Sequence, residues 1–246
     1  AERVKSMPAL LGEADLVKTL QQLPGVAVGT EGMTGLYVRG GGADENLYLL
    51  DGNPVYHVNH LLGFFSAFNP DAIKNTRFYK GSFPAEYGGR LSSVVDVRMN
   101  DGNRQEYHGN ISVGLLSARA NLEGPIVKDR SSFNVSVRRT WLDLITGTAL
   151  AIVNKNSDTK ESFGYHFFDI NAKVNHSFSE RSRAYLSFYM GQDAFRQGSK
   201  EKHEDSDDMF LWRWGNLIGS AGWNYVFGQK LFGNLMVGYS RFRSHI

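Results

Sequence analysis

Apolar and polar side chains alternate with a period of two along most of the chain after about residue 107. Between Phe168 and Phe178 nearly all even-numbered side chains are apolar and the odd-numbered ones are polar, and the stretch from Arg183 to Met190 repeats the alternation. Successive side chains of a β-strand point to opposite faces, so this pattern predicts strands with one apolar and one polar face. About seven such strands fit before Ile246, and a helical bundle is excluded for this half of the chain.

The alternation changes phase once, near the start of this half. The apolar positions are odd-numbered up to Leu115 and even-numbered from Leu116. Because a slip of one residue exchanges the two faces of a strand, we expect a tight hairpin or a bulge at Leu115-Leu116.

The predicted connections between strands differ in length. Residues 124–130, 179–181 and 228–230 are short, whereas residues 143–162 and 192–208 are long and polar. Short turns at one end and long loops at the other are typical of outer-membrane β-barrels, whose strands cross the bilayer at a tilt. A soluble antiparallel sheet with one face on a core is the alternative at this stage. The aromatic girdles of a barrel are predicted from side chains near strand ends, namely Trp212, Trp214, Trp223, Tyr225 and Phe227.

Residues 1–103 have a different, mixed pattern. Apolar residues at helical spacing predict a helix from Glu13 to Leu23, which Pro24-Gly25 ends. The sequence Asn69-Pro70-Asp71 predicts the start of a second, short helix that runs to Lys74. Short apolar runs bounded by Gly or Asp predict a small sheet with strands at residues 25–28, 36–39, 47–50, 76–79 and 94–98.

Composition narrows the function. The chain has 27 Lys and Arg against 25 Asp and Glu, and the net charge of +2 argues against a nucleic-acid-binding surface. The absence of Cys excludes disulfides, thiolate metal sites and cysteine nucleophiles. Gly accounts for 27 of 246 residues and aromatic side chains for 13%, a composition that suits a β-rich chain. The longest apolar runs, residues 61–68 and 144–153, are too short for a membrane-spanning helix.

No motif in the chain predicts catalysis. The glycine-rich stretch after Arg39 lacks the helix that follows a dinucleotide-binding loop, since residues 46–50 are predicted as a strand. His57 and His60 are three residues apart, but without carboxylates nearby in the sequence they fit a polar loop better than a metal site. The charged run at residues 200–208 fits a solvated loop. We therefore predict no enzyme, no cofactor and no metal site.

Five ordered segments of the first half resemble the plug domain of TonB-dependent outer-membrane receptors. They are Pro24-Gly-Val26, Leu36-Tyr-Val-Arg-Gly40, Asn46-Leu-Tyr-Leu-Leu-Asp-Gly52, Phe68-Asn-Pro-Asp-Ala-Ile73 and Phe78-Tyr-Lys-Gly-Ser-Phe-Pro-Ala-Glu-Tyr-Gly-Gly-Arg-Leu-Ser-Ser-Val-Val-Asp-Val97. Each segment alone is weak, but their order is specific. The chain is similar in particular to the plugs of Bacteroidetes receptors.

The resemblance implies an α+β plug domain followed by antiparallel β-strands of a transmembrane β-barrel that is incomplete here, with about 7 of 22 strands. It places the plug domain at residues 1–103 and the N-terminal part of the barrel at residues 104–246. At roughly 20 residues per strand and turn, a full barrel needs more than about 400 residues after the plug, and only about 140 follow residue 103. We therefore expect a fragment whose first and last strands are unpaired or pair outside this chain.

The function implied by the resemblance is a TonB-dependent receptor that imports a large scarce nutrient across the outer membrane of a Gram-negative cell, with the plug gating the lumen. Its partners would be TonB with ExbB and ExbD, outer-membrane lipid and a transported ligand that the sequence does not identify, and no nucleic acid. In the family, TonB grips a segment before the plug, and residues 1–11 contain no such segment. The alternative functions are a small outer-membrane barrel with a structural or adhesive role and, third, a soluble α/β enzyme.

The resemblance also implies two sets of site residues. By match to the family's plug, the ligand-facing loops contain Glu31, Met33, Asp44, Tyr56 and His57. Two cations that pair with barrel carboxylates in the family, and so latch the plug, fall on Arg39 and Lys80. Because those carboxylates lie in later strands, we expect the two cations to lack barrel partners here or to pair locally with Asp51, Glu86 or Asp96.

Overall fold

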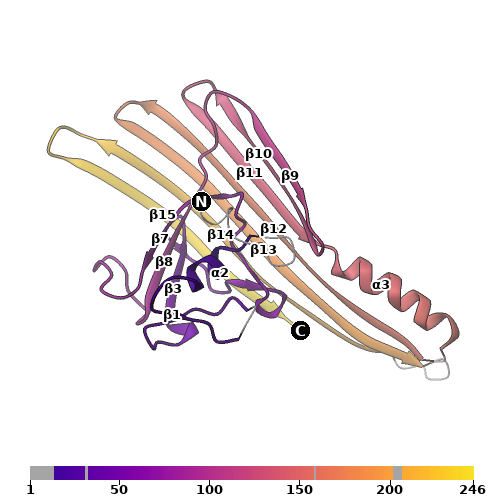
Figure 1. Cartoon of the computed structure of the whole chain (residues 1–246). Helices are drawn as coiled ribbons and strands as arrows, with labels where there is room; N and C mark the ends of the chain where they lie inside the picture. Colours follow the sequence, from indigo (N-terminus) through magenta and orange to yellow (C-terminus); the bar gives the residue numbers. More distant parts are fainter. Residues whose placement is uncertain (1–13, 31–32, 158, 202–206) are drawn as a thin grey trace.

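Figure 1 shows the fold in a computed structural model that describes residues 14–30, 33–157, 159–201 and 207–246. A large curved sheet runs across the molecule, and a smaller domain lies against one of its faces. We call the smaller domain, residues 14–99, the plug, and the large sheet, residues 108–245, the wall. Among the described helices, none is both long and apolar enough to cross a bilayer.

Seven antiparallel strands form the wall, and each pairs with its neighbour in sequence. In sheet order they are β9 (His108–Val113), β10 (Ser117–Val127), β11 (Ser131–Thr140), β12 (Thr159–Ser179), β13 (Ser182–Glu201), β14 (Asp207–Val226) and β15 (Phe232–His245). The predicted hairpin at Leu115-Leu116 is confirmed, because β9 pairs with β10 and the Gly114 N–H donates to the Ser117 carbonyl at 2.8 Å. β9 and β15 are the two edges of this open sheet, as expected for an incomplete barrel.

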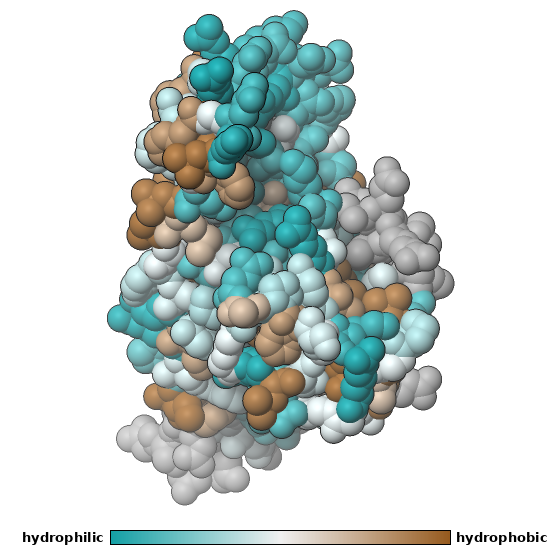
Figure 2. Space-filling model, turned by 90° about the vertical axis from the view of Figure 1, so that its left-hand side faces the viewer, coloured by the Kyte–Doolittle hydropathy of each residue, from teal (hydrophilic) through white to brown (hydrophobic). Residues whose placement is uncertain are grey.

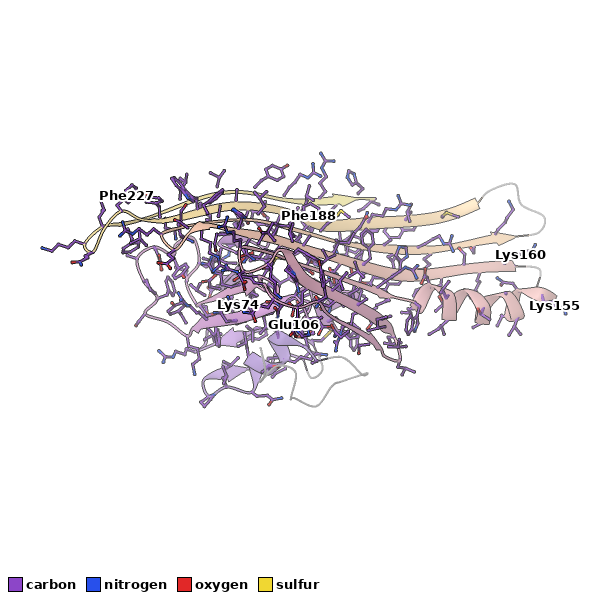
Figure 3. All side chains as sticks on the ribbon, turned by 90° about the horizontal axis from the view of Figure 1, so that it is seen from above. Lys74, Glu106, Lys155, Lys160, Phe188 and Phe227 are labelled. Atoms are coloured by element: carbon purple, nitrogen blue, oxygen red, sulfur yellow. The ribbon has the colours of Figure 1, made fainter. Side chains whose placement is uncertain are left out.

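The strands of the wall are joined differently at its two ends. Short turns join β10 to β11, β12 to β13 and β14 to β15 at one end, which we call the turn end. At the other end, which we call the loop end, α3 (Leu142–Val153) and η3 (Asn154–Asn156) connect β11 to β12. Seen from above, Phe227 and Lys160 lie at these two opposite ends (Figure 3).

The wall has a buried polar face and an exposed apolar face, the reverse of a sheet in a soluble protein. Along β12 the polar side chains Asp169, Asn171 and Lys173 are buried, whereas Leu186 on β13 and Val237 on β15 are 64% and 63% exposed. Figure 2 shows hydrophobic side chains gathered along one side of the upper part of the molecule. A large exposed apolar face beside a buried polar face is the arrangement of a sheet whose outward side meets lipid.

A four-stranded sheet of order β4-β3-β8-β7 forms the centre of the plug. The elements of the plug are α2 (Leu16–Gln21), β1 (Val26–Ala27), β2 (Tyr37–Val38), η1 (Ala43–Glu45), β3 (Asn46–Leu50), β4 (Asn53–Pro54), β5 (Asn59–His60), η2 (Leu61–Gly63), β6 (Phe65–Ser66), β7 (Ile73–Tyr79) and β8 (Ser93–Met99). β1, β2, β3, β7 and β8 confirm the five predicted strands. β3 and β8 are parallel, and β7 runs antiparallel to β8.

One carboxylate fixes the start of α2. Asp15 Oδ1 accepts the backbone N–H groups of Val17 and Lys18 at 2.8 and 3.1 Å, which caps the helix. Asp15 Oδ2 accepts the N–H of Ser66 at 2.6 Å and so joins α2 to β6. The buried face of α2 packs into the same apolar core as the middle of β8.

The predicted helix after Asn69 is wrong. Asn69 Oδ1 accepts the N–H of Asp71 at 3.0 Å, and the Ala72 N–H donates to the Asn69 carbonyl at 3.0 Å, so the three residues close a turn. The chain then enters β7 at Ile73 because pairing with β8 offers its backbone a ladder of hydrogen bonds.

The two long connections are more regular than predicted. Residues 143–162 contain α3, whose apolar sequence is helix-compatible, and not a polar loop. Residues 192–208 are mostly strand, because β13 and β14 stay paired as far as Lys200 and Asp207. Both wall strands therefore extend well beyond the length that a bilayer requires.

The prediction of aromatic girdles is correct for one end only. Trp223, Tyr225 and Phe227 follow one another on the outward face at the turn end, with ring centroids 5.6 and 4.6 Å apart. Trp214 is only 4% exposed, and both it and Trp212 face inward. They do so because even-numbered positions of β14 lie on the polar face that meets the plug.

Candidate functional site

The plug meets the wall mainly through polar side chains on the inward face. The contacts extend from Arg119 on β10, which pairs with Asp71 at 2.8 Å, to Ser240 on β15, which donates to the Pro54 carbonyl at 2.6 Å. Between these limits lie a buried histidine cluster, a charged group towards the turn end and an aromatic group towards the loop end. This interface is the candidate site.

His60 of β5 is held between two wall carboxylates. Its Nδ1 lies 2.7 Å from Asp193 Oδ2, and its Nε2 lies 2.9 Å from Asp169 Oδ1. The imidazole is 2% exposed and stacks on the ring of Phe167 at a centroid distance of 4.2 Å. Both ring nitrogens face acceptors, so the geometry favours the doubly protonated imidazolium.

The electrostatics agree with that geometry. Burial alone would lower the pKa of the His60 imidazole, but the carboxylates of Asp169 and Asp193 raise it to about 9. His60 therefore carries a positive charge at neutral pH. Among the described residues, no group of three or more His, Asp or Glu side chains is arranged to hold a metal ion.

Arg138 of β11 completes the histidine cluster. Its Nε donates to Asp169 Oδ2 at 2.7 Å, and its Nη2 donates to the Ser66 carbonyl of β6 at 2.8 Å. The guanidinium also lies over the Phe167 ring at 5.0 Å. His60 and Arg138 thus set two cations against two carboxylates, and the cluster joins β5 and β6 of the plug to β11, β12 and β13.

The charged group towards the turn end is centred on Asp101. Its Oδ1 lies 3.1 Å from Lys173 Nζ, and its Oδ2 lies 2.8 Å from Arg183 Nη2 and 2.6 Å from Lys74 Nζ. Lys173 Nζ also lies 3.2 Å from Asp51 Oδ1 of the plug. Burial would raise the pKa of Asp101, but these cations hold it well below its usual range.

A close backbone approach joins the plug to β14 and β15. Asn53 Nδ2 donates to Ser220 Oγ, and a Cβ on Gly238 would overlap the side-chain amide of Asn53. Any larger residue at position 238 would therefore force the Asn53 side chain to move.

Towards the loop end, the interface becomes aromatic. Phe65 of the plug is buried with Tyr165, Phe167 and Trp214 of the wall. The Trp214 indole N–H donates to His57 Nε2 at 3.1 Å. Burial lowers the pKa of His57, so the neutral ring accepts this hydrogen bond.

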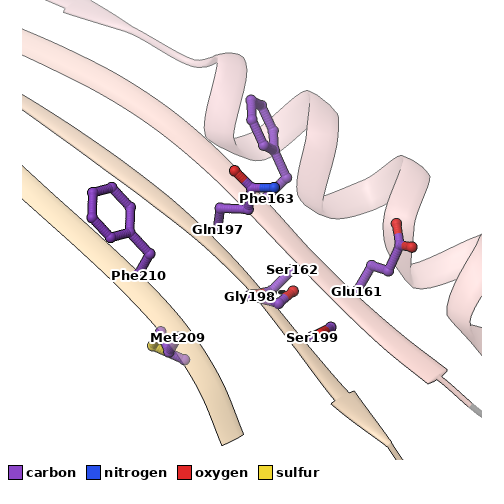
Figure 4. A pocket seen from close by; sticks show the side chains of 8 residues that line it. All are labelled: Glu161, Ser162, Phe163, Gln197, Gly198, Ser199, Met209 and Phe210. Carbon is purple, nitrogen blue, oxygen red and sulfur yellow. Dashed lines mark hydrogen bonds between the residues drawn. The ribbon is translucent and has the colours of Figure 1, made fainter.

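The aromatic face continues past the plug into a cavity of about 790 Å³. Phe163, Gln197 and Phe210 form one row across β12, β13 and β14, because Phe163 pairs with Gln197 and Gln197 pairs with Phe210. The full lining, drawn in Figure 4, is Glu161, Ser162, Phe163, Gln197, Gly198, Ser199, Met209 and Phe210. Aromatic faces with a few amide and hydroxyl groups can bind a ligand that is partly apolar.

One of the five predicted ligand-facing residues contacts the aromatic group, and a second is its neighbour in sequence. His57 contacts Trp214, and Tyr56 beside it is 59% exposed. Met33 lies against Gly63, where its Sδ would be 3.2 Å from a Cβ. Asp44 belongs to η1, and no hydrogen bond or ring contact among the described residues joins it to this group. Glu31 lies outside the described residues.

The two predicted latch residues, 41 positions apart in sequence, lie side by side in the plug. Lys80 Nζ donates to the Pro24 carbonyl at 2.7 Å. The Arg39 N–H donates to the Gly25 carbonyl at 3.1 Å, and Arg39 Nη1 would lie 3.4 Å from a Cβ on Gly81.

Pairing with local carboxylates was one of the two predicted possibilities for Arg39 and Lys80, and it does not occur among the described residues. Within the described part of the chain, neither Arg39 nor Lys80 forms an ion pair. Two of the suggested carboxylates are engaged elsewhere, since Asp51 pairs with Lys173 and Asp96 pairs with Arg98 at 3.1 Å.

The histidine cluster does not follow from the local sequence around His60, because its partners Asp169 and Asp193 are 109 and 133 residues away. One signal is present in the sequence: Arg138, Asp169 and Lys173 are charges within predicted strands, on the polar face. Such charges need partners if that face is covered.

Comparisons with known proteins agree with this architecture. Residues 6–95 match the family model of the TonB-dependent receptor plug domain. No curated protein matches the chain in sequence. Because receptors of this family are not enzymes, the match also supports the prediction that the chain is not one.

Three solved structures show the same fold. The siderophore receptor PirA from Acinetobacter baumannii is 16% identical, with a TM-score of 0.54, and the match covers 99% of this chain and 47% of that one. A mutant of the ferric enterobactin receptor PfeA from Pseudomonas aeruginosa is 15% identical, with a TM-score of 0.52 and coverage of 91% and 46%. The outer-membrane transporter YddB from Escherichia coli is 10% identical, with a TM-score of 0.50 and coverage of 99% and 47%.

The chain thus spans about half the length of these relatives. Its plug packs on the polar face of an open seven-stranded wall whose outward face is apolar. The chain therefore carries a TonB-dependent receptor plug domain followed by antiparallel strands with the fold of a partial receptor barrel.

Proposed function

We propose that the chain is part of a TonB-dependent transporter that imports a large scarce nutrient across the outer membrane of a Gram-negative cell. Residues 1–103 form the plug domain, and residues 104–246 form the N-terminal part of the barrel. TonB, with ExbB and ExbD, supplies the energy, and outer-membrane lipid surrounds the barrel.

The observation that carries this proposal is the contrast between the two faces of the wall. The wall turns a charged face towards the plug and an apolar face outward. A barrel with a polar interior as wide as that of the 22-stranded transporters needs a plug. The alternative of a small barrel would need β9 and β15 to pair, and they stand at opposite edges of the sheet.

We infer that the ligand binds at the loop end, above the plug. Tyr56, His57 and Met33 contribute from the plug, and the aromatic row of the wall contributes from β12 to β14. Glu31 and Asp44 remain in the proposal as plug loops matched to the family. Loops on a rigid sheet are common binding surfaces, and the cavity at the loop end supplies room for a ligand.

We also infer that two sets of charges hold the plug. The histidine cluster binds it to the strands of this chain, and Arg39 with Lys80 latches it to carboxylates on later strands. Lys80 offers a charge but cannot form the bidentate fork of an arginine.

The transport proposal predicts a growth phenotype. A strain lacking the full-length gene should lose growth on one member of a panel of iron chelates, glycans and cobalamins supplied as sole source. Loss of TonB should abolish the same growth, because uptake draws on the inner-membrane complex. Growth on every member without the gene, or uptake that persists without TonB, would contradict the proposal.

The ligand-facing loop predicts a binding defect. With the ligand found on the panel, Tyr56→Ala in the full-length receptor should weaken binding about 5- to 100-fold, the usual range for a buried aromatic contact of about 1–3 kcal/mol. Titration of purified receptor measures the affinity. Leu91→Ala, which truncates another exposed plug side chain, is the control. If the unmodified receptor, Tyr56→Ala and Leu91→Ala bind the ligand with equal affinity, Tyr56 is not part of the binding site.

The latch predicts leakage. Arg39→Ala in the full-length receptor should raise entry of a bulky antibiotic and change the rate of ligand uptake, because the barrel carboxylate proposed to pair with Arg39 would lose its partner. The readouts are antibiotic sensitivity and uptake of labelled ligand. Arg90→Ala, at an exposed position of the plug, should leave both unchanged. The assignment fails if Arg39→Ala behaves like that control.

The histidine cluster predicts a pH dependence of plug stability. The pKa of His60 is about 6.5 when the plug is unfolded and about 9 when it is docked. Its contribution is therefore complete below pH 6.5 and is lost as the pH rises through 9. The difference in pKa corresponds to roughly 3 kcal/mol. Urea unfolding of the plug in the full-length receptor, followed through a label at Leu91, should show this fall.

Two variants test whether His60 is the cause. His60→Gln should lower stability at pH 7 and flatten the profile between pH 6.5 and 9, because the titrating group is gone. His108→Gln removes an imidazole that is 52% exposed and should keep the wild-type profile. Stability that rises across this interval in the unmodified receptor would refute the role of His60.

A further inference from the structure

The outward face of the wall changes character near the loop end. On β15 the outward positions run from the apolar Leu235, Val237 and Tyr239 directly into Arg241 and Arg243. The first three are each at least 55% exposed. On β14 the outward series passes from Leu217 through Gly215 to Arg213, and the exposed Leu211 and Met209 follow towards the loop end. A band of arginines therefore follows the apolar band on two neighbouring strands.

The three arginines surround one hollow. Arg243 pairs across the sheet with Gly215, Arg241 pairs with Leu217, and Arg213 stands two positions along β14 from Gly215. Gly215 has no side chain to fill the space between them. The resulting cavity has a volume of about 340 Å³ and is lined by Met190, Gly191, Gln192, Arg213, Trp214, Gly215, Asn216, Leu217, Arg241, Arg243 and His245.

The lining of this cavity contains no carboxylate. Within the described residues, none of the three arginines forms an ion pair. An outward arginine on β11 differs, because Arg139 Nη2 lies 2.7 Å from Asp143 of α3. Three guanidinium groups that line one cavity repel one another, and an anion placed between them would offset that repulsion. Guanidinium groups match phosphate best, since they donate two parallel hydrogen bonds to it.

The depth of the cavity fits lipid head groups. Along β14, Arg213 at the cavity and Trp223 in the aromatic girdle of the turn end are ten residues apart. Ten residues span about 33 Å along a strand. At the usual tilt of about 40°, this length corresponds to about 25 Å across the membrane, which is the height of the apolar band of an outer-membrane barrel. Arg213 thus lies about the height of one apolar band away from the girdle of the turn end.

We propose that Arg213, Arg241 and Arg243 form a binding site for the phosphate groups of a lipid head group in the outer leaflet. A further strand added to the free edge of β15 would pair through its backbone and leave this outward face open to lipid. The proposal rests on the membrane placement proposed above. Arginine stems can lie along the apolar band while their charged ends reach the phosphates.

The test uses the full-length receptor in detergent, incubated with micelles of diphosphoryl lipid A, the monophosphoryl form or an uncharged lipid. The lipid that co-purifies is measured by mass spectrometry. Diphosphoryl lipid A should be retained most and uncharged lipid least. The double variant Arg213→Gln/Arg243→Gln should lower retention of the diphosphoryl form at least tenfold. Millimolar inorganic phosphate should not displace it, because the site also needs the apolar surface beneath.

The matched control removes the same charge elsewhere. Arg130→Gln/Arg181→Gln changes two exposed arginines at the turn end and should leave retention unchanged. Equal retention by both double variants would overturn the proposal, and displacement by inorganic phosphate would assign the site to free phosphate instead. Resistance of the barrel to cold detergent denaturation verifies folding. Loss of lipid binding with normal ligand uptake would leave the transport proposal intact, so the two can fail separately.

Discussion

Charged side chains in the middle of the wall strands determine where the plug lies. Facing lipid at the bilayer midplane, Arg138 and Lys173 would each cost about 2–4 kcal/mol and Asp169 somewhat less, which favours an inward orientation. Even there, a buried charge needs a partner. The plug supplies His60 to one carboxylate pair and Asp51 to the lysine. The plug's orientation on the wall thus follows from matching these charges.

The same contacts reconcile firm docking with movement. An intact buried ion pair adds little net stability, because desolvation offsets most of the attraction. Breaking one partner away is costly, since the other charge stays buried. When the plug leaves as a unit, both members of each ion pair become exposed to water together. Separating a pair in this way costs far less free energy than removing one member while the other stays buried. In the proposed transporter, the histidine cluster, with its two cations and two carboxylates, would suit a plug that seals the barrel and is later displaced.

Much of the fold could be predicted from local patterns. The period of two identified the wall strands, their faces and the hairpin at Leu115-Leu116, because side-chain direction in a strand depends only on position. The turn at Asn69 could not be separated from a helix start, since the same residues favour both. Trp214 was assigned to the wrong face because its aromatic character was weighed above its position in the alternation. The pairing of His60 with Asp169 and Asp193 joins residues 109 and 133 positions apart in sequence, and nothing local encodes it.

Because of the alternation, the two faces of one strand segment can contact different environments. On β14, Trp212 and Trp214 face the aromatic group near the plug, while Arg213 between them faces outward beside Arg243. Because neighbouring side chains of a strand do not share a face, a substitution on one side alters the other side only through the backbone. The outward arginines can therefore adapt to the membrane and the inward aromatics to a ligand without mutual constraint. The residues that change less freely are glycines of close approach, such as Gly238, where a Cβ would overlap the Asn53 side chain of the plug.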